Sequence, residues 1–333
     1  MTAPLLDVRD LHVSFEIRRD GDMPWTKRRE LKALNGVNLT LNAGETLGIV
    51  GESGCGKSTL ARALIQMVPA SGKVLWQGQT DLLALTPRQM LAYRSQVQMV
   101  FQDPLASLNP RMPVGAIIAE PLRTHHPDLS QTQIKQRVQE MMERVGLLSN
   151  QINRYPHEFS GGQCQRIGIA RALIVGPKLL ICDEPVSALD VSIQAQVINL
   201  LAELQRDLGL AMIFIAHDLS VVKHISDRVM VLYLGRTMEL AAAQALFAHA
   251  AHPYTKALLS AVPIPDPAKE RAKQMIPLEG DLPSPMSPPS GCVFRTRCAI
   301  AQDRCTSEVP ALLGTAHQVA CHLVNTATLE HVE

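Results

Sequence analysis

The chain has 333 residues, of which 46% are hydrophobic and 19% are charged, so it can bury a sizeable core and is not disordered as a whole. Its 32 Lys and Arg residues against 31 Asp and Glu residues leave a formal net charge of +1. This balance argues against a protein that holds nucleic acid through bulk positive charge. The length favours a core domain with a smaller satellite.

The sequence also limits the compartment in which the chain is expected. It has no run of about 18 consecutive apolar residues, so we do not expect it to span a membrane by itself. Its N-terminus lacks a basic region followed by an apolar run, so we do not expect a secretory signal. The cytosol is therefore the default, and there clustered cysteines indicate a metal more often than disulfides.

In the N-terminal third, the pattern of apolar residues predicts several strands. These strands either alternate apolar and polar residues or are apolar throughout. The polar stretch 18–32, which holds Gly21 and Pro24, is expected to be a long hairpin loop, and residues 42–45 a turn. In chain order the predicted elements are strands at 5–17, 34–41 and 46–50, a helix at 59–68 and a strand at 96–101.

The pattern changes after residue 103, where prolines become frequent. Residues 130–145 read as an amphipathic helix with Ile134 and Val138 on its apolar face. We interpret residues 106–159 as an inserted helical subdomain.

Helices and strands alternate after this subdomain, which indicates an α/β fold with a mostly parallel sheet covered by helices. The predicted elements are a helix at 163–175, a strand at 179–182, a helix at 191–207 and strands at 211–216 and 228–233. After about residue 265 a Pro-rich linker leads into a small tail. The predicted domains are a core formed by 1–105 and 160–245, the helical subdomain 106–159 and a C-terminal extension 246–333.

A phosphate-binding loop is predicted directly after the strand at 46–50. Residues 51–58 match G-x-x-x-x-G-K-[ST] in full, and a helix is expected to follow. Backbone N–H groups of such a loop point at a phosphate, Lys57 can reach the β- and γ-phosphates, and the Ser58 hydroxyl can ligate Mg²⁺. The alternative is a Gly-rich turn that matches by chance. The predicted nucleotide-binding residues are Gly51, Glu52, Ser53, Gly54, Cys55, Gly56, Lys57, Ser58 and Thr59.

Two acids follow the buried strand at 179–182. Asp183 is expected at the carboxyl end of the sheet, where it can hold Mg²⁺. Glu184 can orient or deprotonate the water that attacks the γ-phosphate. The alternative is that both acids only cap the next helix; the phosphate loop makes that alternative weaker.

Ser160-Gly161-Gly162-Gln163 opens a predicted helix about 20 residues before Asp183. With the two motifs above, this segment resembles the signature of the ATP-binding cassette (ABC) family. The resemblance implies a P-loop NTPase (RecA-like) fold with an inserted α-helical subdomain. Taken alone, Ser160–Gln163 could be an ordinary N-cap turn.

The ABC resemblance implies roles for further residues. Gln102 corresponds to the Q-loop residue, which contributes to catalysis and Mg²⁺ binding, and Asp190 to the D-loop. His217 is similar to the switch histidine, although a satisfied histidine at a strand end is the structural alternative. Phe15 is the candidate for stacking on adenine. Family members pair head to tail, so that Ser160 and Gly162 of one cassette close over the γ-phosphate on the phosphate loop of the other.

Segments 100–111, 154–160, 252–258 and 287–298 are similar to ATPase subunits of bacterial oligopeptide and dipeptide importers. That resemblance implies ATP hydrolysis coupled to peptide uptake at the cytoplasmic face of the inner membrane. The implied partners are a homologous cassette, two transmembrane permease subunits and, indirectly, an external peptide-binding protein. Residues 103–125 would form much of the groove that receives a permease helix.

Four of the seven cysteines crowd the tail, at positions 292, 298, 305 and 321. Four soft ligands suit an iron–sulfur cluster or tetrahedral zinc, although the familiar C-x2-C spacing is absent. Free thiols are the alternative and disulfides a weaker one. The importer resemblance favours a [4Fe–4S] cluster at Cys292, Cys298, Cys305 and Cys321, with Zn²⁺ as the second choice. Cys55, Cys164 and Cys182 are expected to be packing residues.

The expected function is therefore an ATPase subunit that powers oligopeptide import. Alternatives are import of dipeptides or other peptide-like substrates, or a regulatory subunit that binds ATP while a partner hydrolyses it. A soluble cassette ATPase acting on ribosomes or DNA is a further alternative, and the near-zero net charge argues against it.

Overall fold

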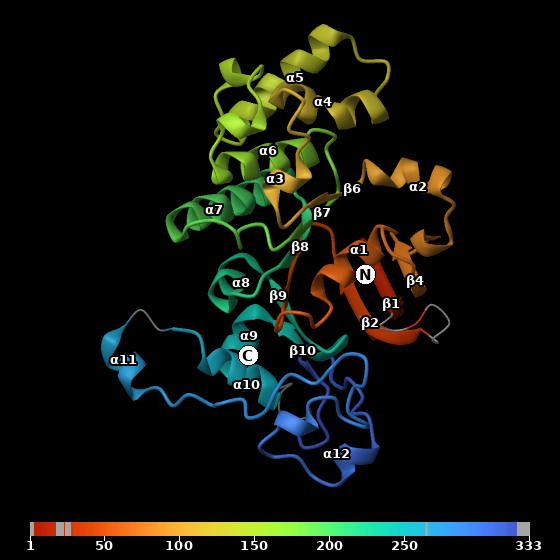
Figure 1. Cartoon of the computed structure of the whole chain (residues 1–333), viewed down its shortest axis with the longest axis vertical. Coiled ribbons are helices and arrows are strands. Elements are labelled where there is room, and N and C mark those ends of the chain that lie inside the picture. Colours follow the sequence, from red (N-terminus) through yellow and green to blue (C-terminus); the bar gives the residue numbers. More distant parts are fainter. Residues whose placement is uncertain (1–2, 18–22, 24–27, 264–265, 325–333) are drawn as a thin grey trace. The chain divides into compact units, whose positions relative to one another are not determined.

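The computed structural model describes residues 3–17, 23, 28–263 and 266–324, and its elements are labelled in Figure 1. The chain divides into two compact units. The first unit comprises Met1–Thr40, Leu47–Leu83 and His217–Glu333, and the second comprises Leu41–Thr46 and Ala84–Ala216. Most of the predicted hairpin loop at 18–32 lies outside the described residues.

The first unit contains two groups of strands. In one, β1 (Leu6–Ile17) and β4 (Ser71–Trp76) pair antiparallel within the strand order β2-β1-β4-β5, where β2 is Arg29–Leu41 and β5 is Thr80–Asp81. In the other, β3 (Thr46–Val50) runs parallel to β9 (Arg228–Tyr233), and β10 (Arg236–Ala242) pairs antiparallel with β9. All five residues of β3 are buried, as expected of a strand covered on both faces.

Helices of the first unit pack on these strands. A Cβ on Gly48 of β3 would lie 2.4 Å from Val222 of α8, so this helix lies directly against the strand. The helices are α1 (Lys57–Leu64), α8 (Leu219–Ile225), α9 (Ala243–His249), α10 (Pro253–Ser260) and α11 (Pro267–Ala272).

In the second unit β7 (Leu179–Asp183) runs parallel to β6 (Val97–Val100) on one side and to β8 (Ala211–Ile215) on the other. All residues of β7 and β8 are buried. Figure 1 shows α4, α5 and α6 gathered in this unit. Its helices are α2 (Pro87–Arg94), α3 (Pro104–Ser107), α4 (Val114–His125), α5 (Gln131–Arg144), α6 (Gly161–Leu173) and α7 (Val191–Leu208).

The predicted strands and helices are confirmed, most with small shifts at their ends, and the α/β class is confirmed. Strand β2 begins five residues before the predicted strand at 34–41, so residues 29–32 are strand and not part of the predicted loop. The sequence did not predict α4, because prolines were read there only as breaks. Pro113 precedes α4 and Pro121 lies inside it. Proline at a helix start is tolerated because its missing N–H has no helical partner there.

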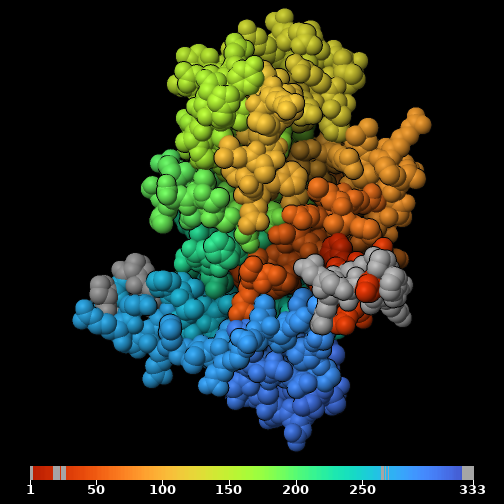
Figure 2. Space-filling view, in the orientation of Figure 1, coloured from red at the N-terminus to blue at the C-terminus, as the bar shows by residue number. Residues whose placement is uncertain are grey.

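The tail folds onto the first unit, with α12 at Arg304–Ser307 and β11 at Gln318–Val319. Strand β11 pairs antiparallel with β10, and Phe294 is buried edge-on against Tyr233, with ring centroids 5.4 Å apart. Figure 2 shows the described residues from about 290 to 324, in blue, as one compact mass. The segment after the Pro-rich linker therefore shares the core of the unit.

A buried carboxylate joins β10, α10 and the tail. Glu239, fully buried, accepts hydrogen bonds from the backbone N–H groups of Ala251 (2.7 Å) and His252 (3.0 Å), and its Oε1 lies 2.6 Å from Nε2 of His317. Burial raises the pKa of Glu239, but these partners outweigh that effect and lower it overall. The ionised carboxylate thus holds three segments together.

Acidification is expected to reduce the free energy of unfolding through His252. Burial lowers its pKa to about 4, and Glu239 offsets only part of that effect. Nδ1 of His252 accepts the Tyr254 backbone N–H at 3.0 Å, as a neutral ring does. Because the unfolded chain binds this proton near pH 6.5 and the folded chain does not, stability falls by about 1.4 kcal/mol per pH unit between these values.

The measurement is urea unfolding between pH 4.5 and pH 7.5 for the wild type and for His252→Asn, which keeps a hydrogen-bond acceptor but does not titrate. The variant should show a shallower loss of stability on acidification. An identical slope in both proteins would show that His252 is not the responsible group.

Candidate nucleotide-binding site

The residues predicted to bind or hydrolyse the nucleotide divide between the two units. The first unit holds residues 51–59, Phe15 and His217, and the second holds Gln102, Asp183, Glu184, Ser160–Gln163 and Asp190.

The phosphate loop lies between the end of β3 at Val50 and the start of α1 at Lys57, as predicted. Gly51 (φ 152°) and Gly56 (φ 107°) have left-handed backbone conformations. A Cβ on Gly51 would lie 2.2 Å from the carbonyl oxygen of Leu232, and one on Gly56 would lie 2.6 Å from that of Ala33. Only glycine fits at both positions, so the loop's curvature depends on them.

Lys57 places its charge inside this loop. Its side chain is only 4% exposed, and Nζ donates to the carbonyl oxygens of Gly51 (2.8 Å) and Glu52 (3.1 Å). The ammonium therefore lies among the backbone groups of the loop at the start of a helix. That combination of positive charge and N–H groups suits a phosphate.

Three other loop positions have distinct surroundings. Ser58 and Thr59 lie half-buried in the first turn of α1, whereas Cys55 is 1% exposed. Burial raises the pKa of the Cys55 thiol, and the nearby Lys57 lowers it by less. Cys55 thus stays protonated and is a packing residue, as are Cys164 and Cys182, which are also fully buried.

Sequence reasoning missed two partners of Glu52. Arg297 in the tail forms a two-pronged ion pair with the Glu52 carboxylate, at 2.6 Å and 3.0 Å. The hydroxyl of Tyr254 accepts the Glu52 backbone N–H at 2.9 Å. No pattern in the sequence signals either contact, because the residues lie more than 200 positions apart.

In the second unit the structure brings Gln102 and Glu184 together. Nε2 of Gln102 donates to Oε2 of Glu184 at 2.9 Å, although the two residues are 82 positions apart. Glu184 follows β7 with φ at 46°, and its N–H donates to the carbonyl oxygen of Ile215. A non-glycine residue in this conformation is strained, which is common at functional sites. Asp183, at the end of β7, is buried.

The segment Ser160–Gln163 opens α6 with a reciprocal cap. The Gln163 backbone N–H donates to the Ser160 hydroxyl at 3.3 Å, and the Ser160 N–H donates to the Gln163 side chain at 3.0 Å. A Cβ on Gly162 would lie 2.4 Å from Ile193, so α6 and α7 approach closely there. Ser160 and Gly161 are exposed, whereas Gly162 is buried.

The other three predicted residues differ in exposure. Phe15 is half-buried on β1, Asp190 is exposed directly before α7, and His217 is exposed two residues after β8. Their roles stay predictions.

The four tail cysteines are free thiols in one neighbourhood. The backbone N–H of Cys292 donates to the carbonyl oxygen of Cys305 at 2.9 Å. Burial raises the pKa of Cys292, and the thiols of Cys305, Cys298 and Cys321 raise it further. Yet in the part of the chain that the structure describes, no group of three or more His, Cys, Asp or Glu side chains is arranged to hold a metal ion. The expected iron–sulfur or zinc site therefore lacks structural support.

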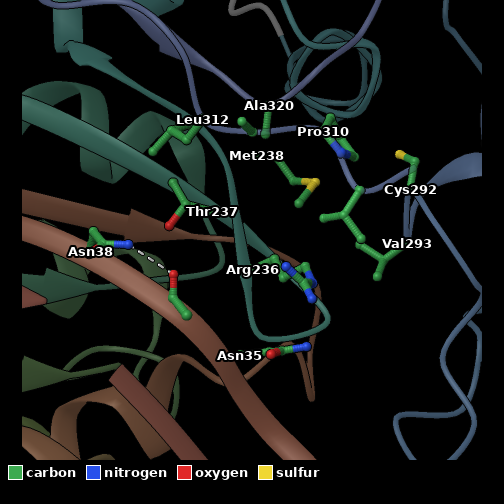
Figure 3. Close-up of a pocket in the computed structure, with 13 residues that line it drawn as sticks. Asn35, Asn38, Arg236, Thr237, Met238, Cys292, Val293, Pro310, Leu312 and Ala320 are labelled. Carbon is green, nitrogen blue, oxygen red and sulfur yellow. Dashed lines mark hydrogen bonds between the residues drawn. The ribbon is translucent and has the colours of Figure 1, made fainter. Parts of the chain in front are cut away.

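A separate hollow of about 240 Å³ lies between β10 and the tail (Figure 3). Its lining includes Asn35, Arg236, Met238, Cys292 and Val293, but no residue of the phosphate loop. Of the predicted site residues only Cys292 borders it, so this hollow is not the nucleotide site.

Comparison with known families identifies two segments of the chain. Residues 34–187 match the family described as ABC transporter, and residues 238–305 match the family described as oligopeptide/dipeptide transporter, C-terminal region.

Curated relatives match almost the full chain. Oligopeptide transport ATP-binding protein OppF of Salmonella typhimurium is 63% identical over 319 residues, and that of Escherichia coli is 62% identical, each match covering 95% of both chains. A putative oligopeptide transport ATP-binding protein, YkfD of Bacillus subtilis, is 51% identical over 97% of both chains.

Solved structures share the fold. CbiO1 of Clostridium perfringens, part of an ABC transporter complex, superimposes with a TM-score of 0.62 at 27% identity, over 74% of this chain and 92% of that one. The ATP-binding cassette MJ0796 with ADP and phosphate bound superimposes with a TM-score of 0.64 at 24% identity, over 72% of this chain and 98% of that one.

Replacing Lys57 with Ala is expected to weaken nucleotide binding at least about tenfold, because hydrogen bonds from a charged group contribute about 1.5–3 kcal/mol. The dissociation constant of a fluorescent ATP analogue measures the change. Lys73→Ala, which alters an exposed lysine of the same unit, is the matched control. Equal affinity in both variants would contradict the role of Lys57.

Proposed function

Because the chain belongs to the family of ABC transporter ATPases, we propose that it is the ATP-hydrolysing subunit of an importer that takes up oligopeptides across the bacterial inner membrane. The observation that carries this proposal is the likeness to the OppF proteins, which continues past the ATPase core through the tail. If the similarity were limited to the ATPase core, it would support ATP hydrolysis but would not indicate a class of substrate.

Mg·ATP fits the residues that the chain provides. The phosphate loop offers glycine backbone N–H groups and the buried ammonium of Lys57. The Ser58 hydroxyl, the Asp183 carboxylate and the Gln102 amide are hard oxygen donors of the kind that Mg²⁺ prefers. Bound Mg²⁺ would neutralise the charge that develops on the phosphates. Phe15 would stack on the adenine ring.

Glu184 is proposed to accept the proton of the attacking water. The Gln102 amide holds one carboxylate oxygen at 2.9 Å, and the backbone bond to Ile215 fixes the start of the side chain. A base fixed in this way can orient water without first reorganising. His217 is proposed to act with Glu184 when a second cassette closes the site.

The second half of each site is proposed to come from a homologous cassette. Ser160 and Gly161 lie exposed at the start of a 13-residue helix, whose N-terminus attracts anions. We propose that Ser160–Gln163 and Asp190 act on the nucleotide bound by the partner, so that ATP joins the two subunits and hydrolysis releases them.

The proposed location is the cytoplasmic face of the inner membrane, beneath two permease subunits. Within the described residues, no helix combines the length and apolar character needed to cross a bilayer. Leu105, which is 54% exposed on α3, and a hollow of about 300 Å³ lined by α4 and α5 support a docking groove for a permease helix. From the sequence we also propose a core formed by 1–105 and 160–245, a helical subdomain at 106–159 and a C-terminal extension at 246–333.

Replacing Glu184 with Gln is expected to preserve ATP binding and lower turnover at least about 100-fold, because proton transfer by a positioned side chain contributes 10²–10⁴-fold. The assay uses the complex purified with its permeases, with and without a peptide-loaded binding protein. Glu203→Gln, which changes an exposed glutamate on α7, is the control.

Turnover of Glu184→Gln near the wild-type rate would contradict the base assignment. It would favour the alternative in which this subunit binds ATP while the partner hydrolyses it. Wild-type turnover that rises with a dipeptide-loaded protein and not with longer peptides would favour dipeptide import.

We also propose that the four tail thiols take a metal, with a [4Fe–4S] cluster preferred over zinc. The support is the gathering of four cysteines, where neighbouring thiols add to the effect of burial in raising the pKa of Cys292 and of Cys298; among the described residues no ligand geometry supports it. Anaerobic purification with iron, sulfide and zinc analysis is expected to find about four irons per chain. Cys298→Ser should lose them and Cys164→Ser should not. Metal-free protein with wild-type ATPase activity would refute this proposal.

A further inference from the structure

The tail contacts the phosphate loop through one ion pair. Nη1 of Arg297 lies 2.6 Å from Oε2 of Glu52, and Nη2 lies 3.0 Å from Oε1, so both carboxylate oxygens are bound. The Arg297 side chain is 8% exposed and that of Glu52 is 26% exposed. A parallel, two-bond arrangement of this kind fixes the relative position of both groups.

A second contact holds the backbone of the same loop residue. Tyr254, which is completely buried on α10, accepts the Glu52 N–H at 2.9 Å through its hydroxyl. The carbonyl oxygen of Glu52 accepts Nζ of Lys57 at 3.1 Å. Each polar group of Glu52 is therefore engaged, and one of its partners is the charge that the loop presents to phosphate.

Arg297 is itself held by packing. Phe294, three residues earlier, is buried with its ring centroid 5.3 Å from that of Tyr254 and 5.4 Å from that of Tyr233. The Arg297 backbone N–H donates to the carbonyl oxygen of Phe294. The guanidinium thus projects from a turn that the aromatic cluster anchors, so the ion pair is not a mobile surface contact.

We propose that Arg297 is a positioning residue for nucleotide binding: through Glu52 it holds the phosphate loop in the shape that binds the phosphates. The inference rests on the proposed function in that the loop binds Mg·ATP. It assigns to the tail a direct influence on nucleotide affinity, without a contact between Arg297 and the nucleotide.

The test is a double-mutant cycle on the purified chain, with the dissociation constant of Mg·ATP as the readout. Arg297→Gln and Glu52→Gln are each expected to weaken binding about tenfold. The double variant should bind no more weakly than either single variant, because each substitution already breaks the pair. Arg297→Lys, which keeps the charge but not the two-bond geometry, should restore part of the affinity.

Arg304→Gln is the matched control, because Arg304 forms an exposed ion pair with Glu308 in the same tail. It should leave ATP affinity within about twofold of wild type. In the assembled transporter, Arg297→Gln should raise KM for ATP while kcat at saturating ATP stays within about twofold, which a general loss of folded protein would not produce. Thermal melting checks that each variant is folded.

Two results would overturn the inference: unchanged ATP affinity in Arg297→Gln, or independent, additive losses in the double variant. Should Arg297→Gln fail to fold, Arg297→Lys decides, with a few-fold loss expected and wild-type affinity as the contrary result. Failure of the wild type itself to bind ATP would instead refute the proposed function.

Discussion

The whole site depends on a steric constraint at two glycines. Gly51 and Gly56 turn the backbone through left-handed conformations where carbonyl oxygens of neighbouring segments leave no space for a side chain. The curve closes around Lys57, whose ammonium binds the loop's own carbonyl groups. Because backbone N–H groups attract phosphate only when they converge, the chemistry follows from this curvature.

At the carboxyl end of β7, a functional side chain is held in position in a different way. There a non-glycine residue, Glu184, has positive φ, and two hydrogen bonds to distant segments hold it. The phosphate loop avoids strain by using glycine, whereas this position accepts strain in order to direct a carboxylate. Both solutions fix a functional group before any ligand arrives, which reduces the reorganisation needed for the reaction.

Local signals in the sequence predicted the features that depend on local physics. The strands β3 and β9 were predicted because continuous apolar runs bury both faces, and the phosphate loop because its glycines and lysine are adjacent. Helix α4 was missed because Pro121 lies inside it. The Glu52–Arg297 pair was unpredictable, since neither periodicity nor capping reaches across such a separation. The Gln102–Glu184 contact was not predicted either, because the family resemblance gave each residue a role without pairing the two.

The ion pair between residues 52 and 297 joins positions 245 residues apart. During translation the ribosome completes β3 and the loop long before it synthesises Arg297. The phosphate loop of the nascent chain therefore lacks this ion pair until Arg297 has emerged from the ribosome. A message that ends between the last nucleotide-binding motif and Arg297 would yield a cassette that has every such motif but lacks the Glu52–Arg297 ion pair. Synthesis through Arg297 thereby becomes a condition for this contact with the phosphate loop.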